Sequence, residues 1–157
     1  MRRRSAVVLT AVLITGLTGC GSTSKNTLID RSRSIGPIAV GETKAKIEAA
    51  YGKGQRAFLP GRPHNTPITF YPAVLIGVLY YEGHAIYVET TASRYRTKSG
   101  MRVGSTAAQL RKSGAECQQD QCGVINGNLA TTFFMSSSYP SDRATRAIRV
   151  VVGPLGS

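Results

Sequence analysis

The sequence predicts an α+β fold of two tandem units, each a short helix followed by antiparallel strands. A Val-Gly-x-Thr sequence occurs at 40–43 and again at 103–106, and an amphipathic segment of helical spacing follows each copy. Stretches rich in Val, Ile, Tyr and Thr come next in both copies, which is typical of strands. We therefore expect an open sheet with the short helices packed on one of its faces.

Both predicted helices begin at a threonine. Thr43 and Thr106 stand where an N-cap hydroxyl accepts a hydrogen bond from the first turn, and Gln109 has capping-box spacing from Thr106. Gly52 and Gly114 favour helix ends at these positions, because glycine adopts the left-handed conformation that follows many helices. Helices of about nine residues are not stable alone in water, so we expect them to pack on the sheet.

The predicted strands alternate apolar and polar residues, which is typical of a sheet with one buried face. Glu82-Gly83 is a plausible hairpin turn between two of them. The closing stretches AIYVET and AIRVVV of the two units align with each other. The expected strands are 57–59, 68–71, 74–81 and 85–91 in the first unit, and 123–125, 129–136 and 147–152 in the second.

These patterns divide the chain into six segments. The two units are expected at 35–92 and 101–153, joined by a basic linker at 93–100 and followed by a tail at 154–157. Residues 1–19 are predicted to be a lipoprotein signal peptide. Residues 20–34 are polar and Ser-rich without a structural period, which indicates a lipidated flexible tether.

The N-terminal segment has the composition of an export signal. Arg2-Arg3-Arg4 precede an apolar run at 5–15, which is too short to span a bilayer but fits a signal-peptide core. The following Leu17-Thr18-Gly19-Cys20 resembles the lipobox of bacterial envelope lipoproteins. That resemblance implies cleavage before Cys20 and acylation of its sulfur, palmitate included. An ordinary secretory signal peptide with a chance cysteine is the alternative.

Two or three acyl chains on one residue give stable membrane anchoring. We therefore expect a lipid-anchored, extracytoplasmic protein on the cell membrane or the outer membrane. An oxidising compartment permits disulfides, and Cys117 and Cys122 are the cysteines left after Cys20. The four residues between them suit a disulfide across a tight turn.

The charge is strongly positive. The chain has 20 Lys and Arg against 8 Asp and Glu, and without Arg2, Arg3 and Arg4 the balance is 17 against 8, a net charge of +9. Such a chain is attracted to anionic partners, either phosphate-bearing envelope polymers and lipids or an acidic protein face. Export makes nucleic acid an improbable partner. A generic basic surface that keeps the protein soluble is the alternative.

The first repeated segment carries a family likeness. Val40-Gly41, Thr43, Ile47 and Tyr51-Gly52-Lys53, followed by strands, resemble the repeat of the SmpA/OmlA (BamE-like) lipoproteins. They also resemble β-lactamase-inhibitor-protein-like domains, which carry two such units in tandem. The resemblance implies a non-enzymatic binding or assembly protein. Glu42 stands where those families often have an apolar residue, and no inhibitor loop matches residue by residue.

The sequence contains few of the residue patterns that enzymes use for catalysis. The sequence has no nucleophile elbow, P-loop, HExxH or EF-hand pattern, and its carboxylates are scattered. His64 lies in a Pro-rich loop and His84 in the hairpin turn, and neither has an evident nucleophile. We expect no enzyme activity, no metal and no cofactor. An envelope hydrolase using His64 or His84 is the alternative.

Two groups of residues are predicted to contact a binding partner. The linker combines cations with an aromatic ring, and Tyr80 and Tyr87 lie on either side of the Glu82-Gly83 turn. Tyrosine and arginine are enriched at interface hot spots. We expect a non-catalytic binding or assembly module for a protein or an anionic envelope polymer, with a purely structural spacer as a further alternative. The predicted binding residues are Arg94, Tyr95, Arg96, Lys98, Tyr80 and Tyr87.

Overall fold

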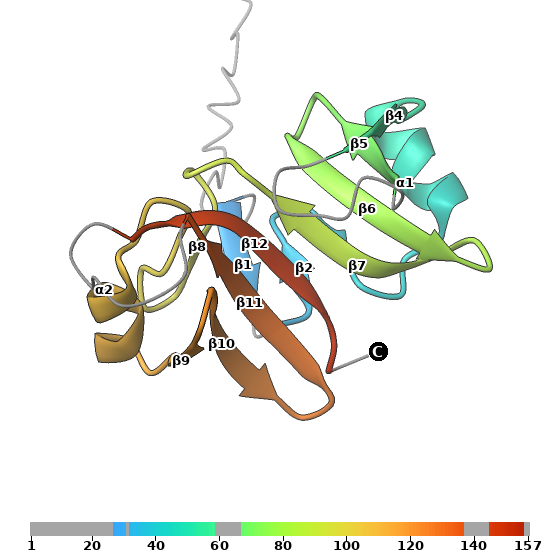
Figure 1. Ribbon diagram of the computed structural model, residues 1–157. Coiled ribbons are helices and arrows are strands. Elements are labelled where there is room, and N and C mark those ends of the chain that lie inside the picture. The colour runs from blue at the N-terminus through green and yellow to red at the C-terminus, as the bar shows by residue number, and fades with distance from the viewer. Residues whose placement is uncertain (1–26, 31, 59–66, 137–144, 156–157) are drawn as a thin grey trace, which may run out of the picture.

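An eight-stranded antiparallel sheet forms one layer of the molecule (Figure 1). The computed structural model describes residues 27–30, 32–58, 67–136 and 145–155. The strand order is β4-β5-β6-β7-β12-β11-β10-β9, so two runs of four strands meet where β7 pairs with β12. The strands are β4 (Gln55–Ala57), β5 (Ile68–Tyr71), β6 (Ile76–Tyr81), β7 (His84–Thr90), β9 (Glu116–Gln118), β10 (Gln121–Asn126), β11 (Leu129–Met135) and β12 (Ala147–Pro154).

The second layer consists of two short helices and a small sheet. The helices are α1 (Lys44–Tyr51) and α2 (Ala107–Lys112), and they lie toward opposite ends of the large sheet with β1 and β2 between them (Figure 1). The small sheet has the order β3-β2-β1-β8, antiparallel except that β1 and β8 run parallel. Its strands are β1 (Leu28–Asp30), β2 (Ser34–Ile35), β3 (Ile38–Ala39) and β8 (Arg96–Thr97).

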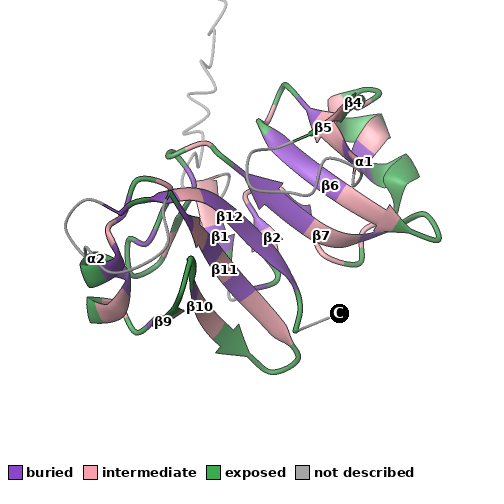
Figure 2. Ribbon diagram, viewed as in Figure 1, coloured by how far each residue is buried: buried purple, intermediate pink, exposed green. Residues whose placement is uncertain are grey.

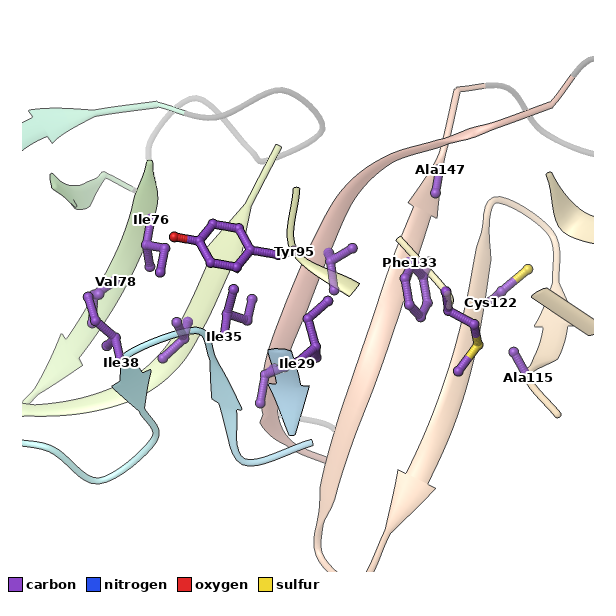
Figure 3. Packing of buried hydrophobic residues seen from close by; sticks show 14 of the residues in the cluster. Ile29, Ile35, Ile38, Ile76, Val78, Tyr95, Ala115, Cys122, Phe133 and Ala147 are labelled. Atoms are coloured by element: carbon purple, nitrogen blue, oxygen red, sulfur yellow. The ribbon is translucent and has the colours of Figure 1, made fainter. Parts of the chain in front are cut away.

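The hydrophobic core lies between these two layers. On the large sheet, Val78 pairs with Val88 and Val88 with Val152, so their side chains share one face. Ile47 of α1 and Leu110 of α2 belong to the same buried cluster. Figure 3 shows Ile29, Ile35 and Ile38 of the small sheet packed toward this face, and Figure 2 shows the burial concentrated along the central strands.

The predicted helix ends are confirmed. The Thr43 and Thr106 hydroxyls accept hydrogen bonds from the backbone N–H groups of Lys46 and Gln109. Gln109 bonds back to the Thr106 N–H, which completes the capping box. Gly52 follows α1 with a φ of 79°, a conformation that L residues rarely adopt. Local hydrogen bonding therefore starts and stops both helices as the sequence indicates.

The predicted hairpin turn is also confirmed. Glu82 and Gly83 both have positive φ and connect β6 to β7, as a tight two-residue turn requires. The upstream strand is shorter than its predicted range of 74–81, because Leu75 also has a positive φ and the chain turns there before β6 begins.

The predicted fold class was wrong. Strands hold 51% and helices 13% of the described residues, so this is a mostly β protein with sheets of four and eight strands rather than an α+β arrangement of helix-strand repeats. The physical reason is the size of the elements. The helices have eight and six residues, too few to form a layer, and strands of two or three residues fill the space beside them.

The fold also begins earlier than the sequence indicates. The predicted tether extends to residue 34, but β1 and β2 lie in the small sheet and Ile29 is buried. The predicted linker at 93–100 is likewise part of the fold, because it contains β8. Strands this short show no apolar alternation, so the sequence gives no periodic indication of them.

Cys117 and Cys122 form a disulfide between the paired strands β9 and β10, as predicted. It lies on the covered face of the sheet, beside α2. Cys20 and the predicted signal peptide lie outside the described residues. Within the described ranges, neither helix is long and apolar enough to cross a membrane.

We expect reduction of the disulfide, or its replacement in a Cys117→Ser/Cys122→Ser variant, to lower the free energy of unfolding by about 2 kcal/mol, because the closed loop is short. Urea unfolding with and without reductant measures this. The double variant should be insensitive to reductant, and an equal effect of reductant on it would contradict the assignment.

Candidate binding surfaces

The predicted binding loop is split by the structure. Tyr95 is 1% exposed and belongs to the core, so its predicted role as a contact residue was wrong. Its hydroxyl donates to the Val74 carbonyl oxygen. The exposed Arg94 donates to the same carbonyl at 2.6 Å and lies over the Tyr95 ring. The hydrogen bonds of Arg94 and Tyr95 therefore hold the loop between β7 and β8 against the turn that precedes β6.

Arg96 and Lys98 remain exposed on the surface. Arg96 lies in a polar pocket with Arg102, Lys112 and Arg146, which we call the basic pocket. Lys98 lies outside it, on the rim of a neighbouring cavity next to β1. The structure thus keeps one residue of the predicted loop in the pocket and adds three cations from elsewhere in the chain.

Tyr80 lies on the covered side of the sheet. It packs against the core, and its hydroxyl lies 2.7 Å from that of Tyr71. Burial raises the pKa of both phenols above the ordinary value, and the hydrogen bond to Tyr71 raises the pKa of Tyr80 further. Tyr80 is therefore a neutral, hydrogen-bonded and partly buried residue beside the core, and its role in contacting a partner stays a prediction.

Tyr87 lies on the opposite face of the sheet. It pairs with Leu79, next to the row in which Glu89 faces Gly77 on β6 and Val151 on β12. A Cβ at Gly153 would lie 2.1 Å from the Tyr87 ring, so that ring packs directly on the glycine backbone of β12. The glycine is needed here for close approach, and Tyr87 remains partly exposed.

We call this second side of the large sheet the open face, because no described helix or strand packs on it. Its outward positions follow from the strand register, since neighbours across the sheet share a face. On the central strands β6, β7, β12 and β11 most of them are apolar or aromatic, whereas Gln55 on β4, Gln121 on β10, and Glu116 and Gln118 on β9 face the same way near the two ends of the sheet. The open-face positions include Phe70, Leu79, Tyr81, Tyr87, Glu89, Arg149, Val151, Thr132, Phe134, Ala130, Gly123 and Ile125.

A buried ion pair stands at the centre of the open face. Arg149 Nη1 on β12 lies 3.0 Å from Glu89 Oε2 on β7, and the two residues are 2% and 0% exposed. The Arg149 guanidinium also lies 3.9 Å from the centroid of the Phe134 ring on β11. Three neighbouring strands are thereby connected through side chains on this face.

The sequence itself carries an indication of this ion pair. Glu89 and Arg149 are the charged residues within the apolar stretches AIYVET and AIRVVV. Two such charges are each costly to bury alone, so they are expected to meet if the strands pair. The antiparallel pairing of β7 with β12, which no local pattern reveals, brings them together.

Of the two histidines considered for catalysis, the structure describes His84 alone. His84 is exposed at the start of β7, and its Nδ1 lies 3.2 Å from the Gly41 carbonyl oxygen. His64 lies outside the described residues. Among the described residues, no group of three His, Cys, Asp or Glu side chains could hold a metal ion.

Comparison with family models, with curated proteins and with solved structures found no match for this chain.

We expect a double-mutant cycle to show strong coupling between Glu89 and Arg149. Glu89→Leu or Arg149→Met alone should lower the free energy of unfolding by about 3 kcal/mol or more, because each leaves a buried charge without its counter-ion. The double variant should recover much of that loss. Chemical denaturation measures all four proteins, and strictly additive losses would contradict the coupling.

Stability should also respond to alkali through Tyr71 and Tyr80. Their raised pKa values favour the protonated phenols in the folded state, so this contribution is complete below about pH 10, the ordinary tyrosine pKa, and is lost as the pH rises further. Tyr80→Phe should cost about 1 kcal/mol at neutral pH and flatten the alkaline loss. Tyr81→Phe, at an exposed ring, is the control, and identical alkaline profiles for all three proteins would refute the assignment.

Proposed function

We propose that this chain is a lipid-anchored, extracytoplasmic, non-catalytic binding module that holds a protein partner on the open face of its large sheet. The observation that carries this is the apolar character of that face. Antiparallel sheets with one solvated face normally present polar side chains to water. Here Phe70, Leu79, Tyr87 and Phe134 are partly exposed, and Tyr81 and Ile125 are 65% and 63% exposed.

The chemistry of the open face suits a protein interface. Aromatic rings and arginine are enriched at interface cores and hot spots, whereas charged side chains are depleted there. The charges at the centre of this face, Glu89 and Arg149, are already paired with each other. A partner covering the face would therefore not have to remove free charges from water at that point.

The surface relief of the open face also favours a protein partner. Gly123, Ala130 and Thr132 leave a shallow cavity of about 380 Å³ at the β9-β10-β11 end of the sheet. Ile125 and Leu155 border it, and Leu155 is exposed as well. A side chain of the partner could enter this hollow while the exposed Ile125 and Leu155 contact the partner's surface.

Anchoring is supported by the sequence. The lipobox-like Leu17-Thr18-Gly19-Cys20 ends eight residues before β1 begins. Eight extended residues span at most about 29 Å, so an acylated Cys20 would hold the folded part close to the membrane surface. A short anchor of this kind favours partners that are themselves bound to the same membrane.

Site-specific crosslinking tests the proposed function. We expect a photo-reactive residue at Tyr81 or Ile125 to trap the same discrete partner in intact cells. The same residue at Ala49 or Ala108, which are exposed on α1 and α2 in the other layer, should not trap it. An Ile125→Asp change should reduce trapping from position 81, whereas Ala108→Asp should not. Equal trapping from all four positions, or none from the open face, would refute the proposal.

A further inference from the structure

The basic pocket lies apart from the open face and is built from three separate segments. Arg96 comes from β8, Arg102 from the turn after it, Lys112 from the end of α2, and Arg146 from the residue before β12. Together with nearby polar residues they line a cavity of about 490 Å³. The other lining residues are Ser99, Gly100, Met101, Gly104, Ser105, Gln109 and Ser113.

The charge in this pocket is not balanced within the described chain. No acidic residue is among the described residues that line it. The ion pairs recorded between described residues involve Lys44, Lys46 and Arg149, and none involves the four cations of the pocket. Four like charges around one cavity repel each other and raise the local positive potential, which an entering anion would relieve.

Backbone hydrogen bonds hold the three segments in place. Arg146 Nη1 donates to the Gly104 carbonyl oxygen at 3.0 Å, and Gly104 N–H donates to the Ala147 carbonyl oxygen at 2.7 Å. The Arg102 N–H donates to the Ser105 hydroxyl at 3.2 Å. The Arg146 guanidinium and the backbone that carries Arg102 are therefore held in place, so binding an anion would require little reorganisation of this part of the fold.

The chain itself provides a comparison for this pocket. The turn before α1 is built in the same way as the turn before α2: Gly41 N–H donates to the Ala85 carbonyl oxygen, as Gly104 N–H does to that of Ala147. In the first turn the next residue is Glu42, whose carboxylate accepts from Ala39 N–H and pairs with Lys46. In the second turn that residue is Ser105. The turn before α1 therefore carries a carboxylate that balances a nearby cation, whereas the equivalent position in the turn before α2 carries an uncharged hydroxyl.

We propose that the basic pocket binds a phosphate dianion, either free or as the terminal phosphomonoester of a larger molecule. Guanidinium groups bind phosphate oxygens through paired hydrogen bonds, and three of the four cations are arginines. Serine hydroxyls and the Gln109 amide supply further donors. Four cations match a dianion better than the single charge of a phosphodiester.

The pH dependence of binding distinguishes these ligands. A phosphomonoester gains its second negative charge near pH 6. The charged side chains facing the cavity from β8, the following turn, α2 and the start of β12 are arginine and lysine, and no His, Asp or Glu is among the described residues that line it. Affinity for a monoester or for inorganic phosphate should therefore rise across pH 6 because of the ligand. Affinity for a diester should stay flat.

The test uses the full chain in a non-ionic detergent, titrated calorimetrically with inorganic phosphate, glycerol 3-phosphate and glycerophosphoglycerol. We expect saturable binding of one or both dianions, at least about tenfold tighter than the diester at pH 7.5 and weaker at pH 5.5. Similar affinity for both dianions indicates that free phosphate suffices. Preference for glycerol 3-phosphate indicates a carried monoester.

Matched variants locate the binding. Arg96→Gln/Lys112→Gln should weaken phosphate binding at least about tenfold, since it removes two charge-assisted contacts. Lys53→Gln/Arg56→Gln removes the same charge from exposed positions outside the pocket and should leave the affinity unchanged. If the first double variant does not fold, Lys112→Gln alone should weaken binding about threefold. No saturable binding, or equal weakening by both double variants, would overturn the proposal and leave the crosslinking result for the open face unaffected.

Discussion

The pairing of β7 with β12 is the interaction on which the rest of the structure depends. These strands lie some sixty residues apart in the chain, and their contact joins two runs of four strands into one sheet. On the covered face it places Val88 beside Val152 in the core. On the open face it places Glu89 beside Arg149. Both layers of the fold and both faces of the sheet are therefore organised around one ladder.

The buried ion pair between Glu89 and Arg149 helps to specify the register in which β7 and β12 pair. Replacing buried ion pairs with well-packed apolar residues is often neutral or stabilising, so such a pair is weak evidence for stability in itself. What it does here is penalise a shift in strand register, because a slip of one residue would place Glu89 and Arg149 on opposite faces. The Phe134 ring over Arg149 extends that constraint to β11. The open face thus keeps a fixed arrangement although no described element packs on it.

The two glycine turns show how one backbone motif supports different surfaces. Gly41 and Gly104 both have positive φ, both donate to an alanine carbonyl at the start of a long strand, and both precede a threonine N-cap. The backbone requirement selects the glycine and the threonine. The residue between them accepts a hydrogen bond from the backbone N–H three residues earlier, and either a carboxylate, as in Glu42, or a hydroxyl, as in Ser105, meets that requirement. The turn before α1 therefore has a negative charge that the turn before α2 lacks, and this difference arises from that single position.

Local physical chemistry determined what the sequence alone could predict: the threonine caps, the ends of both helices, the Glu82-Gly83 turn and the Cys117–Cys122 disulfide each depend on residues close together in the chain. Tertiary structure decided the rest. The β-rich fold class, the burial of Tyr95, the packing of Tyr80 beside the core, and the meeting of Arg96 with Arg102, Lys112 and Arg146 depend on which distant strands pair. Strands of two or three residues carry no period, and pairing over long separations is set by the burial of the whole core, which no local stretch of sequence encodes.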